Sequence, residues 1–203
     1  MQLVIFPPLE PAVRIALAKL KTDQIICYPT DTLYGLGGDA LNRDVVKRIA
    51  QIKGREMEIP FSVIFADWKM ASEYAKIDAK LEKELLKITP GPYTFLLEAK
   101  KELPAAQGMV VGCRIPENEF CTQLAGKFGR PIISTSANLH GCRQAASIEE
   151  IDENVLEQAG LVVDGGVCKY AQGSTIIDVN KGKITRKGAE FEKARKWIEK
   201  LDV

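Results

Sequence analysis

The sequence has few of the residues that build metal sites and acid–base catalysts. It contains one histidine, His140, in 203 residues, and its five cysteines form no C-x-x-C pair. A zinc site needs clustered cysteine and histidine ligands at short spacings, and a catalytic triad needs a histidine beside its nucleophile. We therefore expect no tightly bound protein metal, and His140 reads as a loop residue. Catalysis is expected to depend on positioning and on charge stabilisation, as in nucleotidyl transfer.

An excess of one charge and a long apolar run are also lacking. Lys and Arg number 28 against 27 Asp and Glu, which argues against wide non-specific binding of nucleic acid. The apolar run at residues 3–6 stops at two prolines, no basic segment precedes it, and no run approaches the roughly 20 residues of a membrane span. The odd number of cysteines is typical of a reduced chain. These features predict a cytoplasmic protein that does not enter a membrane.

Apolar residues, 46% of the chain, recur with helical and strand periods in an interspersed order. This pattern predicts an α/β fold in which flanking helices cover a twisted mixed sheet, as a single domain over residues 1–203. Helices are expected at 10–21, from an N-cap at Asn42 to near Gly54, and at 68–88 (one or two), 117–128, 148–158 and about 190–201. Strands are expected at 25–28, 61–65, 93–97, 110–115, 131–134, 161–163, 174–179 and 183–186, with a glycine-rich loop at 30–38.

Polar residues follow directly on three of the apolar runs, at 30–32, 134–138 and 164–166. Each cluster alone is explained by turn chemistry, because Thr, Ser, Asp, Asn and Gly favour turns. Three clusters at strand ends in one small chain indicate a shared crevice, where open α/β sheets bind ligands. The glycines at 35–38 match neither a Walker P-loop nor a dinucleotide fingerprint.

Four cationic residues occupy positions that a bound anion could account for. Lys53 and Arg55 leave the end of a predicted helix, where they either complement the helix dipole or grip phosphates. Arg114 and Arg186 end apolar strands, where a charge needs a partner, either a bound anion or a salt bridge. Residues 181–200 hold eight Lys and Arg against three Glu, which is either a solvated helix face or a surface that meets a polyanion.

The ordered set of these motifs resembles the YrdC/YciO family over about residues 10–190. No single motif is decisive, but their order is specific. The matching segments are 28–37 (YPTDTLYGLG), 53–55 (K-x-R), 90–92 (PGP), 112–116 (GCRIP), 134–138 (STSAN), 164–166 (DGG) and 174–178 (STIID).

The resemblance implies a sheet with a large concave cavity and the synthesis of threonylcarbamoyl-AMP from ATP, L-threonine and bicarbonate. Mg²⁺ is expected with ATP, and the product feeds tRNA modification, which leaves tRNA or a tRNA-modification protein as a further partner. The residues implied for the nucleotide are Lys53 and Arg55, also expected to be catalytic, with Ser136, Asn138 and Arg186. Those implied for the threonine and carbamate side are Thr32, Tyr34, Arg114, Ser134 and Ser174.

The resemblance also leaves an alternative. Many synthases have Asn at the position of Ile59, His at Ile64 and a hydroxyl residue near Val110, and often Ser near Gln144. The segments at 61–64 and 90–97 resemble the YciO-like branch more closely. The alternative is therefore a YciO-like paralogue that binds a nucleotide, double-stranded RNA or tRNA without robust synthase activity.

Overall fold

The strands of the computed structural model, which describes residues 3–5, 7–54, 60–106 and 108–201, form one mixed sheet. Its order is β1-β8-β2-β3-β7-β4-β6-β5-β9-β10, and it contains both parallel and antiparallel neighbours. The predicted α/β class with a twisted mixed sheet is confirmed. In chain order the strands are β1 (Leu3–Ile5), β2 (Ile26–Pro29), β3 (Tyr34–Gly37), β4 (Ser62–Ile64), β5 (Tyr93–Glu98), β6 (Val110–Arg114), β7 (Ile132–Ser136), β8 (Leu161–Asp164), β9 (Thr175–Asp178) and β10 (Lys183–Arg186).

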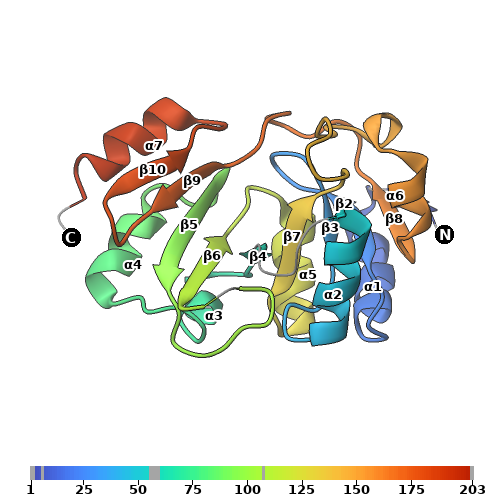
Figure 1. The fold of residues 1–203 in the computed structure, drawn as a ribbon, viewed down its shortest axis with the longest axis horizontal. Coiled ribbons are helices and arrows are strands. Elements are labelled where there is room, and N and C mark those ends of the chain that lie inside the picture. The colour runs from blue at the N-terminus through green and yellow to red at the C-terminus, as the bar shows by residue number, and fades with distance from the viewer. Residues whose placement is uncertain (1–2, 6, 55–59, 107, 202–203) are drawn as a thin grey trace.

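Helices flank the sheet at both ends of the molecule (Figure 1). One end groups α1, α2 and α6 around β2, β3 and β8, and the other groups α4 and α7 around β5, β9 and β10. The predicted segment 68–88 is two helices. In chain order the helices are α1 (Leu9–Leu20), α2 (Arg43–Lys53), α3 (Trp68–Ala71), α4 (Ala79–Leu86), α5 (Glu119–Phe128), the 3-10 helix η1 (Ile148–Glu150), α6 (Glu153–Glu157) and α7 (Phe191–Ile198).

The ends of α2 follow from its sequence. Asn42 Oδ1 accepts hydrogen bonds from the backbone N–H groups of Asp44 (2.9 Å) and Val45 (3.3 Å), which is the predicted N-cap. The helix stops at Gly54, whose φ of 59° lies in the left-handed region that glycine adopts without strain. Lys53 is therefore the last helical residue, at a defined place beside the sheet.

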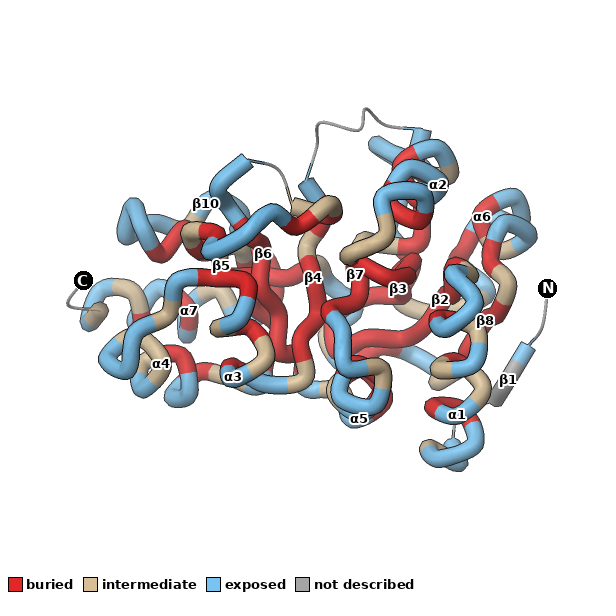
Figure 2. The backbone as a smooth tube through the Cα atoms, turned by 90° about the horizontal axis from the view of Figure 1, so that it is seen from below, coloured by how far each residue is buried: buried red, intermediate tan, exposed pale blue. Residues whose placement is uncertain are grey.

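Two apolar clusters fill the space between helices and sheet. In the first, α1 and α5 pack on each other and on β2, β4, β7 and β8, with Phe120 and Leu124 fully buried. The second, larger cluster lies under α2, α4 and α7, where Phe95 meets the rings of Trp68 and Trp197 at 5.6 and 5.5 Å. Figure 2 shows the result as buried strands inside exposed helix surfaces. The described cysteines are free, and Cys27 and Cys113 are buried, where a thiol packs as a small hydrophobe.

The predicted glycine-rich loop at 30–38 is wrong in part, because residues 34–37 form strand β3. This strand pairs antiparallel with both β2 and β7. A Cβ at Gly37 would lie 2.5 Å from the Tyr28 ring and 2.6 Å from the carbonyl of Ile133, so only glycine fits between these neighbours. The glycines that suggested a loop instead permit tight strand packing. Strand β1 lay in the N-terminal apolar run and was not predicted.

Candidate functional site

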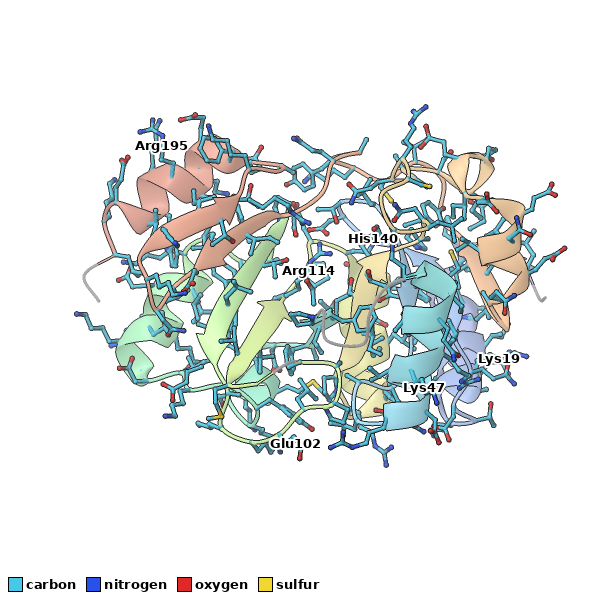
Figure 3. All side chains as sticks on the ribbon, in the orientation of Figure 1. Lys19, Lys47, Glu102, Arg114, His140 and Arg195 are labelled. Atoms are coloured by element: carbon cyan, nitrogen blue, oxygen red, sulfur yellow. The ribbon has the colours of Figure 1, made fainter. Side chains whose placement is uncertain are left out.

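A cavity of about 430 Å³ opens beside the central strands β3, β7, β4 and β6, and the predicted concave cavity is thus present. Its wall carries the cations Lys53, Arg114 and Arg186, and no Asp or Glu belongs to the lining among the described residues. Figure 3 shows Arg114 between the two halves of the sheet with His140 nearby, while Lys47, Glu102 and Arg195 lie at the periphery. The cavity is therefore suited to an anionic ligand.

One face of the central strands changes from core to cavity wall within two residues. Ile64 pairs with Ile132 inside the cluster under α1 and α5, and both are buried. Ser62 and Ser134, the next pair on this face, line the cavity. Because side chains on one face of a strand recur every second residue, this register places hydroxyl groups at the cavity and isoleucines beneath them.

Lys53, Ser136 and Asn138 form one hydrogen-bonded group, although 83 and more residues separate the lysine from its partners. The Lys53 ammonium donates to the Ser136 carbonyl (2.6 Å), to Ser136 Oγ (3.3 Å) and to Asn138 Oδ1 (2.8 Å), and it is buried. Ser136 Oγ donates to Asn138 Oδ1 at 2.5 Å. The lysine thus fixes the loop after β7, and all three residues line the cavity.

Arg114 is held by an acidic residue that sequence reasoning did not assign to the site. Its Nη2 donates to Asp31 Oδ1 at 2.8 Å and to Thr32 Oγ1 at 3.0 Å, and both members of the ion pair are buried. Asp31 also accepts from the backbone N–H of Glu117 at 3.0 Å. Of the two explanations for a charge at this strand end, the structure shows the salt bridge. Arg114 Nε is buried and has no hydrogen-bond partner among the described residues.

Tyr34 joins two of the polar clusters that follow strands. Its hydroxyl donates to the Gly166 carbonyl at 2.8 Å and accepts from the Gly165 N–H at 3.0 Å, and burial raises its pKa. Tyr34 and Thr32 both line the cavity, whereas residues 164–166 do not. The third cluster therefore supports the site through Tyr34.

Ser174 and Arg186 form a further part of the cavity wall. Arg186 donates through Nε and Nη2 to the Ser174 carbonyl (3.0 and 2.8 Å) and through Nη2 to Ser174 Oγ (2.9 Å). Desolvation, followed by the nearby Arg114 guanidinium, lowers the pKa of Arg186. An anion between the two guanidinium groups would offset their mutual repulsion.

Some residues named from the sequence lie elsewhere. Ile64 is core and Val110 is exposed at the start of β6, so neither lines the cavity, whereas Gln144 does. Arg55 and Ile59 fall outside the described residues. Sequence reasoning left Asp31 unassigned. The charge of Arg114 at a strand end required a partner, and this requirement was the signal that could have identified a nearby acidic residue.

The donor set does not form a resident metal site. The described residues contain no group of three or more His, Cys, Asp or Glu side chains able to hold a metal ion. The cavity wall offers hydroxyl and amide oxygens and no carboxylate among these residues. Within the described part of the chain, every helix is too short or too polar to cross a membrane.

Comparison with known proteins finds one family. The family model Sua5_yciO_yrdC, described as "Telomere recombination", matches residues 18–188. A putative threonylcarbamoyl-AMP synthase of Methanocaldococcus jannaschii is 35% identical over 79% of this chain and 77% of its own length. The threonylcarbamoyl-AMP synthase of Mus musculus is 34% identical over 89% of this chain and 68% of its own length.

Solved structures show the same fold. Pyrococcus abyssi Sua5 complexed with L-threonine superposes with a TM-score of 0.89 at 28% identity, over 98% of this chain and 61% of that one. Escherichia coli YciO superposes with a TM-score of 0.82 at 28% identity, over 93% of this chain and 96% of that one. This chain thus spans less than two thirds of the Sua5 protein and nearly all of YciO.

Proposed function

This chain belongs to the Sua5/YciO/YrdC family, and on that premise we propose that it is a threonylcarbamoyl-AMP synthase. It joins L-threonine, bicarbonate and ATP into threonylcarbamoyl-AMP and releases pyrophosphate, and the product serves the N6-threonylcarbamoyl modification of tRNA adenosine. The observation that carries the proposal is the cavity wall, with three cations and no described carboxylate, in a chain 35% identical to a putative synthase.

The nucleotide side of the proposed site is the group formed by Lys53, Ser136 and Asn138. The lysine holds the serine and the amide in place, so that they meet ATP without reorganisation. Arg55, two residues beyond Lys53, is proposed as a further phosphate contact. Mg²⁺ would accompany ATP as part of the substrate, and the described wall would offer it hydroxyl and amide oxygens rather than a carboxylate.

The amino-acid side of the proposed site consists of Thr32, Tyr34, Arg114, Ser134 and Ser174, which line the same cavity. Asp31 balances one charge of this side, and the Arg114 guanidinium is proposed to attract an oxygen anion. Arg186, implied for the nucleotide, donates to Ser174 of this side.

The reaction then needs little acid–base chemistry from the protein. The threonine amine attacks bicarbonate, and the loss of water gives a carbamate. A carbamate oxygen attacks the α-phosphorus of ATP, the bond from that phosphorus to the β-phosphate bridging oxygen breaks, and pyrophosphate leaves. Arg114 and Arg186 stabilise the anionic carbamate and the charge that develops on the phosphates. Because carbamates hydrolyse in water, a recessed cavity protects the intermediate.

The test is pyrophosphate release by the purified chain. Release is expected only when ATP, bicarbonate and L-threonine are all present, and threonine should rank first in a panel of amino acids. Release that ignores threonine, or none where a known synthase is active, contradicts the proposal.

The likeness to YciO over nearly all of that protein favours one second candidate. This candidate is a YciO-like protein that binds a nucleotide or RNA and makes little adenylate. Its signature is an RNA affinity that falls steeply with salt and is lost when the exposed Lys183, Arg186 and Lys187 are neutralised. Absent or salt-independent binding contradicts this candidate.

A further inference from the structure

Thr94 of strand β5 lies behind the cavity wall and is almost fully buried, with 1% of its surface exposed. Its Oγ1 lies 2.7 Å from Ser174 Oγ, and Ser174 is the only side-chain hydrogen-bond partner of this hydroxyl among the described residues. On the neighbouring strand β6, a Cβ at Gly112 would lie 3.4 Å from the Thr94 methyl group. Such a Cβ would make an ordinary van der Waals contact with this methyl group, and the 2.7 Å contact directs the Thr94 hydroxyl toward Ser174.

The Ser174 hydroxyl has two lone pairs and one proton to place. Arg186 Nη2 donates to this oxygen at 2.9 Å and so takes one lone pair. The contact with Thr94 takes either the other lone pair or the proton. If Ser174 donated to Thr94, the Thr94 proton would have no acceptor among the described residues, and a buried unsatisfied donor is costly.

The arrangement that satisfies every group has Thr94 donating to Ser174. Both lone pairs of Ser174 are then occupied, and its own proton is directed to the cavity that Ser174 lines. Two donors on one oxygen also polarise the hydroxyl and strengthen it as a donor.

We propose that Thr94 is a positioning residue that fixes the Ser174 hydroxyl as a hydrogen-bond donor, so that this subsite accepts a carboxylate-type oxygen and rejects an ammonium group. The substrate side of this inference depends on the proposed function, in which two substrates carry such an oxygen, L-threonine and bicarbonate. The nearby Arg186 charge acts in the same direction, because it attracts an oxygen anion and repels an amine cation.

The first experiment compares Thr94→Val, which keeps the methyl group and removes the hydroxyl, with Thr94→Ser, which keeps the hydroxyl. Threonine is titrated at saturating bicarbonate, and bicarbonate at saturating threonine, to find which of the two meets Ser174. We expect Thr94→Val to raise one of these KM values about tenfold, with the KM for ATP within twofold of wild type. Thr94→Ser should restore the wild-type value, and Thr122→Val on α5 is the matched control with no expected change.

The double variant separates positioning from general stability. If Thr94 acts through Ser174, then Thr94→Val with Ser174→Ala is no worse than Ser174→Ala alone. Additive losses, or an equal rise in the KM for ATP, overturn the proposal. Thermal unfolding of each variant shows whether a loss comes from misfolding.

A measurement on the wild-type protein tests the proton arrangement without catalysis. In NMR spectra with labelled threonine and serine, we expect a slowly exchanging hydroxyl proton on Thr94 that shows a nuclear Overhauser effect to Ser174. A protected hydroxyl proton on Ser174, with none on Thr94, overturns the proposal. A wild-type chain that releases no pyrophosphate contradicts the proposed function instead, and the NMR result still decides the role of Thr94.

Discussion

Lys53 Nζ lies 2.8 Å from Asn138 Oδ1, and this contact joins the end of α2 to the loop after β7. The ammonium group also donates to the Ser136 carbonyl, so one buried lysine fixes two of the residues proposed to bind the nucleotide. The pair makes ATP binding depend on the exact position of a helix end.

Replacement of Lys53 by Met is therefore expected to lower ATP affinity at least tenfold, because the loop loses its donor and the phosphates lose a cation. Lys53→Arg should not restore affinity, because a planar guanidinium does not fit where a compact ammonium meets two oxygens within 3 Å. Titration with a fluorescent ATP analogue measures the loss. Lys47→Met, on the exposed side of the same helix, is the control, and an equal loss there contradicts the interpretation.

Asp31→Asn tests the buried ion pair with Arg114. Removal of one charge leaves the other buried and unpaired, and we expect the free energy of unfolding to fall by about 3 kcal/mol. Denaturant unfolding measures this free energy. Glu102→Gln removes the partner of Arg43 where both side chains are mostly exposed, and should change stability by less than about 1 kcal/mol. Similar losses in the two variants contradict the importance of burial.

Stability should fall at alkaline pH through the buried thiol of Cys168. Burial raises its pKa from 9.0 to about 11, so the folded chain keeps a proton that the unfolded chain releases. The stabilising contribution is complete below pH 9 and is lost as the pH rises to about 11. Cys168→Ala should show a shallower decline than wild type over this window in denaturant unfolding under reducing conditions. Cys142→Ser, at the exposed cysteine, should follow the wild-type curve.

Gly188→Ala should disturb the wall that carries Ser174. A Cβ there would lie 2.1 Å from the Gly173 carbonyl and 2.5 Å from the Ser174 carbonyl, so backbone must shift. We expect a loss of about 2 kcal/mol in stability and a raised KM for the substrate that meets Ser174. Gly126→Ala on α5, where the nearest atom is at an ordinary 3.6 Å, should be neutral or slightly stabilising. A neutral Gly188→Ala contradicts the close packing.

Much of the fold follows from local signals. Asn42 begins α2 by capping it with its side chain, and Gly54 ends it in a left-handed backbone conformation. The apolar periods predict most strand ends to within two residues of where the structure has them. The exception at β3 has a physical cause. Glycine permits both a loop and tight strand packing, and only the neighbours Tyr28 and Ile133 decide between them.

The sequence by itself determined the α/β class and the order of the motifs, because these depend on residue type and short-range spacing. The resemblance that this order carries then implied the cationic residues proposed for the nucleotide. Only the tertiary structure decided that Asp31 neutralises Arg114, that Ile64 lies in the core, and that Thr94 meets Ser174. Those contacts join residues far apart in the chain, and strand order and register, which no local pattern specifies, bring them together.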